Sequence, residues 1–311
     1  MKTLTAKLCS GISRTKAFEE KGLAQYAVNI GLKCGHACTY CSSDAMLRIQ
    51  LSKLGIKGSN KDCCVVDPDT PTRVAQDAKN KRNRGMIQLC TTVDAWAPEA
   101  QQYNLGRQCL EAILSEPGWK VRILTKNAAV AKDFDFIEKY RDRVLVGLSI
   151  TATPGKSHIV KITEPNASSI EERLETMKNA HNRGLRTYGM LCPLLPGIAD
   201  SPAQADELVK YLVDCGVEEI FAEAVNPRGR GLIQTQQALE TAGFYDSATA
   251  IRNIRDRHAW SAYVVCLIKN IQQSVRKYYD ISKLRFLQYP NGLSAENIAE
   301  IKKDDAGVVW L

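Results

Sequence analysis

Three cysteines stand close together directly after an apolar stretch of the chain. Cys34, Cys38 and Cys41 are separated by three and two residues and follow the run 26–32. Such short gaps let one loop wrap a corner of a cubane, so the three thiolates can bind three irons of a [4Fe–4S] cluster. The fourth iron is left without a protein ligand and can chelate a small molecule. The spacing therefore predicts an iron–sulfur cluster with one open iron.

The residues alone leave two other interpretations of the three cysteines open. A zinc site needs a fourth ligand, which His36 could supply, and three unrelated buried thiols need none. Zinc-binding cysteines usually occur as two separated pairs, whereas this triplet follows an apolar run that is typical of a strand. The cluster is therefore favoured, and the context that would confirm it is a strand leading directly into the cysteine loop.

Apolar, β-branched runs predict the strands that position the cysteine loop. The first is 25–32, and five more follow at 86–91, 121–125, 144–150, 186–191 and 219–223. Helical segments are expected at 42–54, 98–115, 131–140, 169–183 and 202–215, two of them ended by Gly184 and Gly216. Apolar strands that alternate with amphipathic helices indicate an α/β protein with a parallel sheet, either open and doubly wound or curved into a whole or partial barrel.

In either arrangement the catalytic groups lie at the carboxyl ends of the strands. The residues with polar or sulfur-bearing side chains at those ends are Cys34, Cys90, Asp94, Lys126, Ser149, Cys192, Glu223, Asn226 and Arg228. Hydropathy alone defines the strands, so this clustering supports them independently. We expect the functional site to be built from these residues.

Composition indicates a globular protein of the cytoplasm. The chain has 311 residues, 44% of them hydrophobic, which is enough for a sizeable core. No apolar run approaches the roughly 20 residues of a membrane span, and residues 1–5 lack the core of a signal peptide, so we expect no membrane association. Eleven cysteines without a secretion signal argue against a disulfide framework, and cluster ligands must be reduced thiols.

A basic excess is concentrated in the C-terminal third. The net charge is +8, and between residues 228 and 285 ten basic residues stand against four acidic ones, with tyrosines interleaved. Such a surface suits the phosphates and bases of a nucleic acid, although solvated helix faces and core tyrosines give the same composition. The residues expected to follow a phosphate backbone are Arg252, Arg255, Arg257, Arg276, Lys277, Lys283 and Arg285.

We divide the chain into an N-terminal lead-in (1–24), a central domain (25–232) and a basic, mainly helical C-terminal extension (233–311). Turn residues and a charge run at about 55–84 indicate an insertion in the central domain, with a short helix at 72–80. The insertion contains Cys63 and Cys64. These are better explained as ordinary thiols than as a metal site, because adjacent cysteines chelate one metal poorly.

Several motifs, in order, resemble the spore-photoproduct-lyase-like branch of the radical SAM (S-adenosylmethionine) superfamily. The superfamily signature is three cysteines with this spacing and an aromatic residue before the third, here Tyr40. The branch motifs are Asn29-Ile30 before the loop, TTVD at 91–94, RILTK at 122–126, LSIT at 148–151, EP at 164–165 and NPRG at 226–229. The resemblance covers roughly residues 26–232.

The resemblance implies a partial (β/α)6 radical SAM barrel and radical chemistry. In this branch a reduced [4Fe–4S] cluster cleaves SAM to methionine and a 5′-deoxyadenosyl radical, which abstracts a hydrogen atom. The cluster needs electrons from a reducing partner such as flavodoxin or ferredoxin. Photoproduct lyases use this chemistry on a thymine dimer in DNA, so repair or modification of nucleic acid is the expected activity.

The resemblance also assigns roles to individual residues. The cluster ligands are matched by Cys34, Cys38 and Cys41. The SAM-binding set is matched by Tyr40, Lys126, Ser149, Asn226 and Arg228. Lys126 and Ser149 would lie at the methionine carboxylate of SAM, where a lysine is well suited to bind a carboxylate. The catalytic residues would be Tyr40 and Cys90, the latter as a thiol that returns hydrogen to the product radical.

Two departures from the lyases bear on the substrate. The lyase motif reads Cys-Thr-Ser-Asp, whereas this chain inserts Val93 and so shifts Cys90 by one residue. The lyases also carry a tyrosine after the third cluster cysteine, where this chain has Ser42. Three functions therefore stay open: radical chemistry on nucleic acid, radical chemistry on a peptide or small molecule, and metal-bearing nucleic-acid binding without turnover. The matches at Lys126 and Ser149 disfavour the third.

Overall fold

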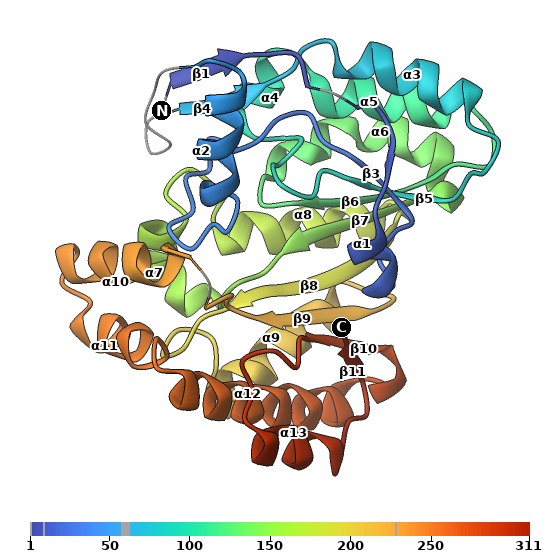
Figure 1. Ribbon diagram of the computed structural model, residues 1–311. Coiled ribbons are helices and arrows are strands. Elements are labelled where there is room, and N and C mark those ends of the chain that lie inside the picture. The colour runs from blue at the N-terminus through green and yellow to red at the C-terminus, as the bar shows by residue number, and fades with distance from the viewer. Residues whose placement is uncertain (1, 9, 57–62, 228) are drawn as a thin grey trace. The chain divides into compact units, whose positions relative to one another are not determined.

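The computed structural model describes residues 2–8, 10–56, 63–227 and 229–311 (Figure 1). These residues form two compact units. The first comprises Met1–Ala37, Cys41–Leu148 and Asn182–Arg186, and the second comprises Cys38–Tyr40, Ser149–His181 and Thr187–Leu311. Both are α/β structures with parallel strands and helices, as the sequence predicts. Within the described ranges, no strand pairing closes either set of strands into a barrel.

The first unit is built on a sheet with the strand order β2-β3-β5-β6-β7. All neighbours pair in parallel except β2, which runs antiparallel to β3. The strands are β2 (Ser13–Arg14), β3 (Tyr26–Val28), β5 (Met86–Leu89), β6 (Lys120–Thr125) and β7 (Val144–Ser149). Four of the six predicted strands are thereby confirmed. The first ends at Val28, earlier than expected, and the side chain of the next residue, Asn29, accepts hydrogen bonds from the loop after β5.

Helices of the first unit connect these strands. They are α1 (Lys16–Glu20), α2 (Asp44–Lys53), α3 (Thr70–Asn80), α4 (Pro98–Gln102), α5 (Leu105–Leu114) and α6 (Phe134–Ile137), with 3₁₀ turns at Ala128–Asp133 and Glu138–Arg143. The prediction of a single helix over 98–115 is wrong, because Asn104 adopts a left-handed φ of 49° and separates α4 from α5. The segment predicted as a helix at 131–140 forms only one α-helical turn between the 3₁₀ turns.

A second, two-stranded sheet joins the N-terminal lead-in to the insertion. In it β1 (Lys2–Thr5) pairs in parallel with β4 (Cys63–Val66). Cys63 and Cys64 are buried on β4, and Cys63 packs with Leu51 and Val65 in a small apolar cluster. This pairing joins residues far apart in the sequence, and no periodicity of the lead-in indicates it.

The second unit contains four parallel strands in the order β8-β9-β10-β11. They are β8 (Arg186–Leu194), β9 (Ile220–Ala224), β10 (Leu284–Gln288) and β11 (Val308–Trp310). The helices are α7 (Ser157–Thr163), α8 (Ile170–Asn182), α9 (Pro202–Asp214), α10 (Gly231–Thr241), α11 (Tyr245–Asn253), α12 (Arg257–Tyr278) and α13 (Ala295–Lys302), with 3₁₀ turns at Pro154–Lys156 and Ile281–Lys283. The C-terminal extension is mainly helical, as predicted, but it also adds β10 and β11 to the sheet.

Packing in the second unit depends on close contact between α9 and β8. A Cβ atom at Gly189 of β8 would lie 2.5 Å from a methyl of Leu212, so only glycine lets this helix approach the strand so closely. Figure 1 shows α12 running alongside α9. Among the described helices, none is both long and apolar enough to cross a membrane.

We expect Leu212→Ala to destabilise the protein by about 2–5 kcal/mol, because the fully buried side chain leaves a cavity against β8. The measurement is urea unfolding of the anaerobically purified protein. The control is Glu207→Ala on the exposed side of the same helix, which should change stability by less than about 0.5 kcal/mol. Equal effects of the two substitutions would contradict this packing.

Candidate functional site

The first part of the cysteine loop is held by a buried carboxylate of the first unit. Cys34 is half-buried, and the N–H of the next residue, Gly35, donates to Glu99 Oε1 at 2.7 Å. A Cβ atom at Gly35 would lie 2.5 Å from Glu99 Oε2, so a larger residue would push the carboxylate away. Glu99 is 4% exposed, and burial raises the pKa of its carboxyl group. The carboxyl group therefore fixes the backbone directly after the first cysteine.

His36, the alternative zinc ligand, is fully buried. Its Nδ1 lies 3.5 Å from Asp94 Oδ2, and its Nε2 lies 3.5 Å from the side-chain nitrogen of Asn127. Within the described part of the chain, no three His, Cys, Asp or Glu side chains converge as the ligands of a single ion would. A cubane cluster does not need such convergence, because each thiolate binds a different iron. Three cysteines in one loop are the donor set that a [4Fe–4S] cluster with one open iron requires.

Asp94 organises the loops that follow β5 and β6. Its carboxylate accepts hydrogen bonds from Thr125 Oγ1 at 2.8 Å, from the Lys126 N–H at 2.8 Å and from the Trp96 N–H at 2.9 Å. The carboxylate is 8% exposed, so these donors replace the water that it loses on burial. The backbone at Lys126 is thereby fixed, while its long side chain stays half-exposed.

Cys90 has an unusual backbone conformation. It follows β5 with a left-handed φ of 65°, which non-glycine residues rarely adopt. Its N–H donates to the Val28 carbonyl at 2.7 Å, and Asn29 Oδ1 accepts from the N–H groups of Thr91 and Thr92 at 2.8 and 3.1 Å. The thiol is 4% exposed, and burial raises its pKa, so it stays protonated at neutral pH.

The middle of the cysteine loop belongs to the second unit. The Thr39 N–H donates to the Thr163 carbonyl at 2.9 Å, and the Thr39 hydroxyl lies 2.9 Å from the hydroxyl of Thr235 on α10. A Cβ atom at Gly231, the first residue of α10, would lie 2.8 Å from the Tyr40 carbonyl oxygen. Cys38 is half-buried beside these contacts. The ends of α7 and α10 therefore hold the segment that contains the second cysteine.

Tyr40 donates its hydroxyl to the carboxylate of Glu164, which also binds the guanidinium of Arg173. The Thr151 hydroxyl donates to the same carboxylate at 2.9 Å, and Arg173 donates to the Ser149 carbonyl at 3.0 Å. Burial is the largest cause of a pKa of Tyr40 well above its ordinary value, and the nearby Cys38 and Glu164 raise this pKa further. Tyr40 and Ser149, both predicted site residues, are therefore joined by one buried network.

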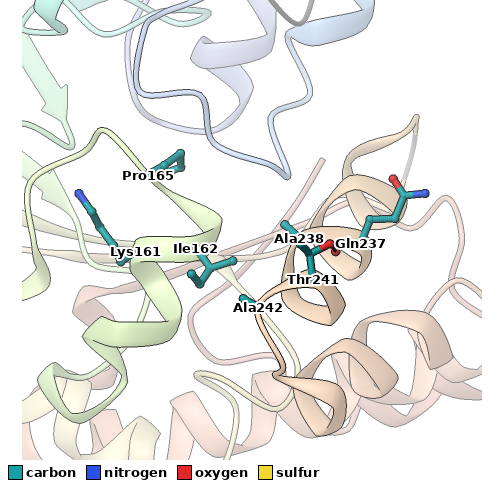
Figure 2. Close-up of a pocket in the computed structure, with 7 residues that line it drawn as sticks. All are labelled: Lys161, Ile162, Pro165, Gln237, Ala238, Thr241 and Ala242. Atoms are coloured by element: carbon teal, nitrogen blue, oxygen red, sulfur yellow. Dashed lines mark hydrogen bonds between the residues drawn. The ribbon is translucent and has the colours of Figure 1, made fainter.

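Other predicted residues of the second unit lie at the ends of β8 and β9. The Cys192 thiol is 3.7 Å from Glu223 Oε2, and Asn226 is exposed. Arg228 lies outside the described residues. A surface groove of about 540 Å³ is lined mainly by residues of α7 and α10. Figure 2 shows its lining residues, among them Ile162 of α7 and Ala242, which follows α10. The groove lies farther along α10 than Thr235, which anchors the cysteine loop.

Several of the basic residues that we expected to contact a phosphate backbone form ion pairs within the protein. Arg276 binds Asp304 at 2.7 Å, Lys277 binds Asp206 at 2.6 Å, and Arg285 lies 3.4 Å from Glu219. These pairs are exposed to solvent, so each is weak and a phosphate could compete for the cation. They nevertheless reduce the positive charge that the C-terminal region offers to a polyanion.

Sequence reasoning did not single out Glu99 and Arg173, and it gave Thr151 no role beyond its place in the LSIT motif. The signal for Arg173 is its position on α8, where it falls on the same buried stripe as Ile170, Leu174 and Met177. A charged residue on an apolar helix face requires a buried partner. Glu99 and Thr151 carry no comparable pattern, because both stand in loops or short elements without a clear period.

Comparison with solved structures shows the fold. A spore photoproduct lyase complexed with dinucleoside spore photoproduct superposes with a TM-score of 0.61 and 13% identity, covering 89% of this chain and 79% of the lyase. A variant of that lyase with bound AdoMet and dinucleoside spore photoproduct gives a TM-score of 0.58 and 14% identity, covering 86% and 76%. The protein thus has a fold similar to that of spore photoproduct lyase.

Two curated relatives are more similar in sequence. The uncharacterized protein ORF301 of Acidianus two-tailed virus is 28% identical over 67% of this chain and 69% of its own length. The uncharacterized protein MJ0683 of Methanocaldococcus jannaschii is 29% identical over 57% of this chain and 63% of its own length. The chain therefore spans about two thirds of the length of these relatives.

The model of the Radical SAM superfamily matches residues 28–212, which include the cysteine loop, Cys90, Lys126 and Ser149. This match covers more than half of the chain, and the fold is similar to that of a spore photoproduct lyase solved with bound AdoMet. The protein is therefore an enzyme of the radical SAM superfamily, with a [4Fe–4S] cluster and SAM as its cofactors.

Proposed function

We propose that the protein uses radical SAM chemistry to repair or modify nucleic acid. Together the bound cluster and SAM supply a 5′-deoxyadenosyl radical, at the expense of one electron from a reducing partner such as flavodoxin or ferredoxin. The radical removes a hydrogen atom from the substrate, and the chain's own residues bind SAM, position the substrate and return hydrogen where the reaction requires it. The observation that carries this proposal is the cysteine triplet within a superfamily match that begins at Val28, the last residue of β3, and includes α2.

The cluster ligands that we propose are Cys34, Cys38 and Cys41. All three are half-buried thiols in the loop between β3 and α2. By contrast, Cys64 is buried on β4, and burial raises the pKa of its thiol to about 11, which disfavours the thiolate that binds a metal. The three loop thiols are thus accessible to a metal and have the spacing that a cubane cluster needs.

The SAM-binding residues that we propose are Tyr40, Lys126, Ser149, Asn226 and Arg228. Support comes from the backbone of Lys126, which Asp94 fixes, and from its partly exposed long side chain, whose ammonium group is of the kind that binds carboxylates. Ser149 ends β7 and has its carbonyl held by Arg173. Asn226 follows β9 on the surface, and Arg228 is included from the sequence alone.

Cys90 is the thiol that we propose as the hydrogen donor. An S–H bond is weaker than most C–H bonds, so hydrogen transfer from a thiol to a carbon radical runs downhill. The raised pKa keeps the hydrogen on Cys90, and the left-handed backbone is of the kind that persists at functional sites. Tyr40 is the second proposed catalytic residue, but its hydroxyl is engaged by Glu164, which favours a role in positioning.

The nucleic-acid substrate is supported by two observations. The similar lyase structures contain a dinucleoside photoproduct, and the C-terminal region has a basic excess. Ser42, in place of the second lyase tyrosine, together with the ion pairs of the basic region, favours the alternative of a peptide or small-molecule substrate. A non-catalytic, metal-bearing nucleic-acid-binding protein fits superfamily membership poorly. SAM cleavage measured with and without DNA or RNA oligomers separates the two enzyme functions: stimulation by an oligomer supports our proposal, and its absence supports the alternative.

We expect the serine variants of Cys34, Cys38 and Cys41, each prepared separately, to lose the absorbance near about 400 nm that Cys-ligated clusters give. Iron and sulfide are measured after anaerobic reconstitution. Cys266→Ser is the control, because that thiol is exposed on α12 and should leave iron content unchanged. Full iron content in any of the three loop variants would remove that residue from the ligand set.

Cys90→Ala should leave cluster content and SAM cleavage intact while product formation falls or shifts to side products, since the hydrogen donor is gone. Product is quantified by mass spectrometry alongside 5′-deoxyadenosine. Cys63→Ala is the matched control, because it removes another buried thiol of the same unit, 4% exposed like Cys90, on β4. If product yield and identity are unchanged in Cys90→Ala, the donor role is wrong.

Binding of a DNA or RNA oligomer should weaken steeply with salt. Replacing Arg252 and Arg255 by alanine should flatten the log–log slope by about 0.7 to 0.9 for each phosphate that the protein no longer neutralises. Both residues are exposed, in and just after α11. Lys269→Ala is the control, because this lysine of α12 is not among the residues proposed to follow the phosphate backbone. Binding that ignores salt would contradict a phosphate-following surface.

A further inference from the structure

An ion pair between Glu164 and Arg173 is completely buried in the second unit. The two residues are 1% and 0% exposed. Burying such a pair costs several kcal/mol of hydration, and apolar side chains of the same volume often stabilise a protein as well or better. The stability of the fold therefore does not explain the pair, and its hydrogen-bond partners indicate what it does.

Glu164 is held so that its carboxylate cannot turn. Arg173 binds Glu164 Oε2, while its other nitrogens donate to the carbonyl groups of Ser149 at 3.0 Å and Ser168 at 2.8 Å. The Thr151 hydroxyl donates to Glu164 Oε1 at 2.9 Å. Both carboxylate oxygens are therefore hydrogen-bonded. The Tyr40 hydroxyl also donates to Oε1.

We propose that Glu164 is a positioning residue for the cysteine loop and acts through the Tyr40 hydroxyl. Tyr40 is the residue between Thr39 and Cys41, so a fixed phenol ring holds the backbone that presents the second and third cysteines. This inference rests on the proposed role of those cysteines as cluster ligands. In this role Tyr40 must keep its hydroxyl hydrogen-bonded to the Glu164 carboxylate.

The cysteine loop is also held at a second place, which limits the expected effect of losing the Tyr40 hydroxyl. Thr39 is bonded to Thr163 and Thr235 independently of Glu164, and Gly231 packs against the Tyr40 carbonyl. Loss of the Tyr40 hydroxyl therefore leaves the loop attached at its backbone. The cluster should still assemble, but the loop should open more often.

The test is Tyr40→Phe, which removes only the hydroxyl, and the readout is the rate at which reconstituted protein loses iron to a chelator. We expect release to be about tenfold faster than in the parent, the factor that loss of a hydrogen bond to a charged group can produce. The electron paramagnetic resonance signal of the reduced cluster should also broaden, since the loop then samples several geometries.

Tyr263→Phe is the matched control, because it removes another tyrosine hydroxyl of the second unit, one that donates to the Leu194 carbonyl at 2.9 Å. A merely structural role for Tyr40 predicts equal effects of the two variants on iron release, and that result would overturn the proposal. Parental release in Tyr40→Phe would overturn it as well. Failure of the parent protein to take up iron and sulfide would instead overturn the proposed function, so the two failures are distinguishable.

Discussion

A carboxylate buried away from water must be surrounded by hydrogen-bond donors, and this constraint organises the functional loops of both units. In the first unit Asp94 collects donors from Thr125, Trp96 and the Lys126 backbone, while Glu99 takes the N–H of Gly35. Breaking a hydrogen bond to a buried acceptor costs free energy, because the acceptor is then left without a partner. The loops that carry the proposed site residues are therefore fixed by the side chains beneath them rather than by their own sequence.

The same constraint acts in the second unit through Glu164. Its donors come from Thr151, Arg173 and Tyr40, which stand far apart in the sequence. Because Arg173 also binds the Ser149 carbonyl, the carboxylate couples the end of β7 to the middle of the cysteine loop. A superfamily signature of three cysteines and an aromatic residue thus depends on residues outside the signature for its geometry.

The strands of the central domain could be predicted from the sequence because their apolar runs are nearly continuous. Strands β5 to β9 lie within a few residues of the predicted ranges, and the left-handed Gly184 and Gly216 follow α8 and α9 as expected. Strands β1, β10 and β11 could not be predicted in this way. They are short, lie among charged or turn residues, and are stabilised by pairing with strands far away in the sequence.

The site was predictable where chemistry requires a residue type at a fixed spacing, as in the cysteine triplet. It was not predictable where the requirement is geometric, as for Glu99 and Thr151, whose roles follow from which backbone group or carboxylate lies within reach. The helix break at Asn104 belongs to the same class, because nothing in its neighbours' hydropathy marks a left-handed residue. The local sequence pattern determines the helices and strands, whereas tertiary contacts determine the conformation of the loops between them.

The central claim is that the cysteine loop holds a cluster whose fourth iron binds SAM. The most direct measurement is electron–nuclear double resonance on the reduced, reconstituted protein with SAM labelled isotopically at its amino nitrogen and its carboxylate. Direct ligation predicts hyperfine coupling from both labels, which disappears when Cys34, Cys38 or Cys41 is replaced by serine. A reduced cluster that shows no coupling to either label, with SAM present in excess, would contradict the account.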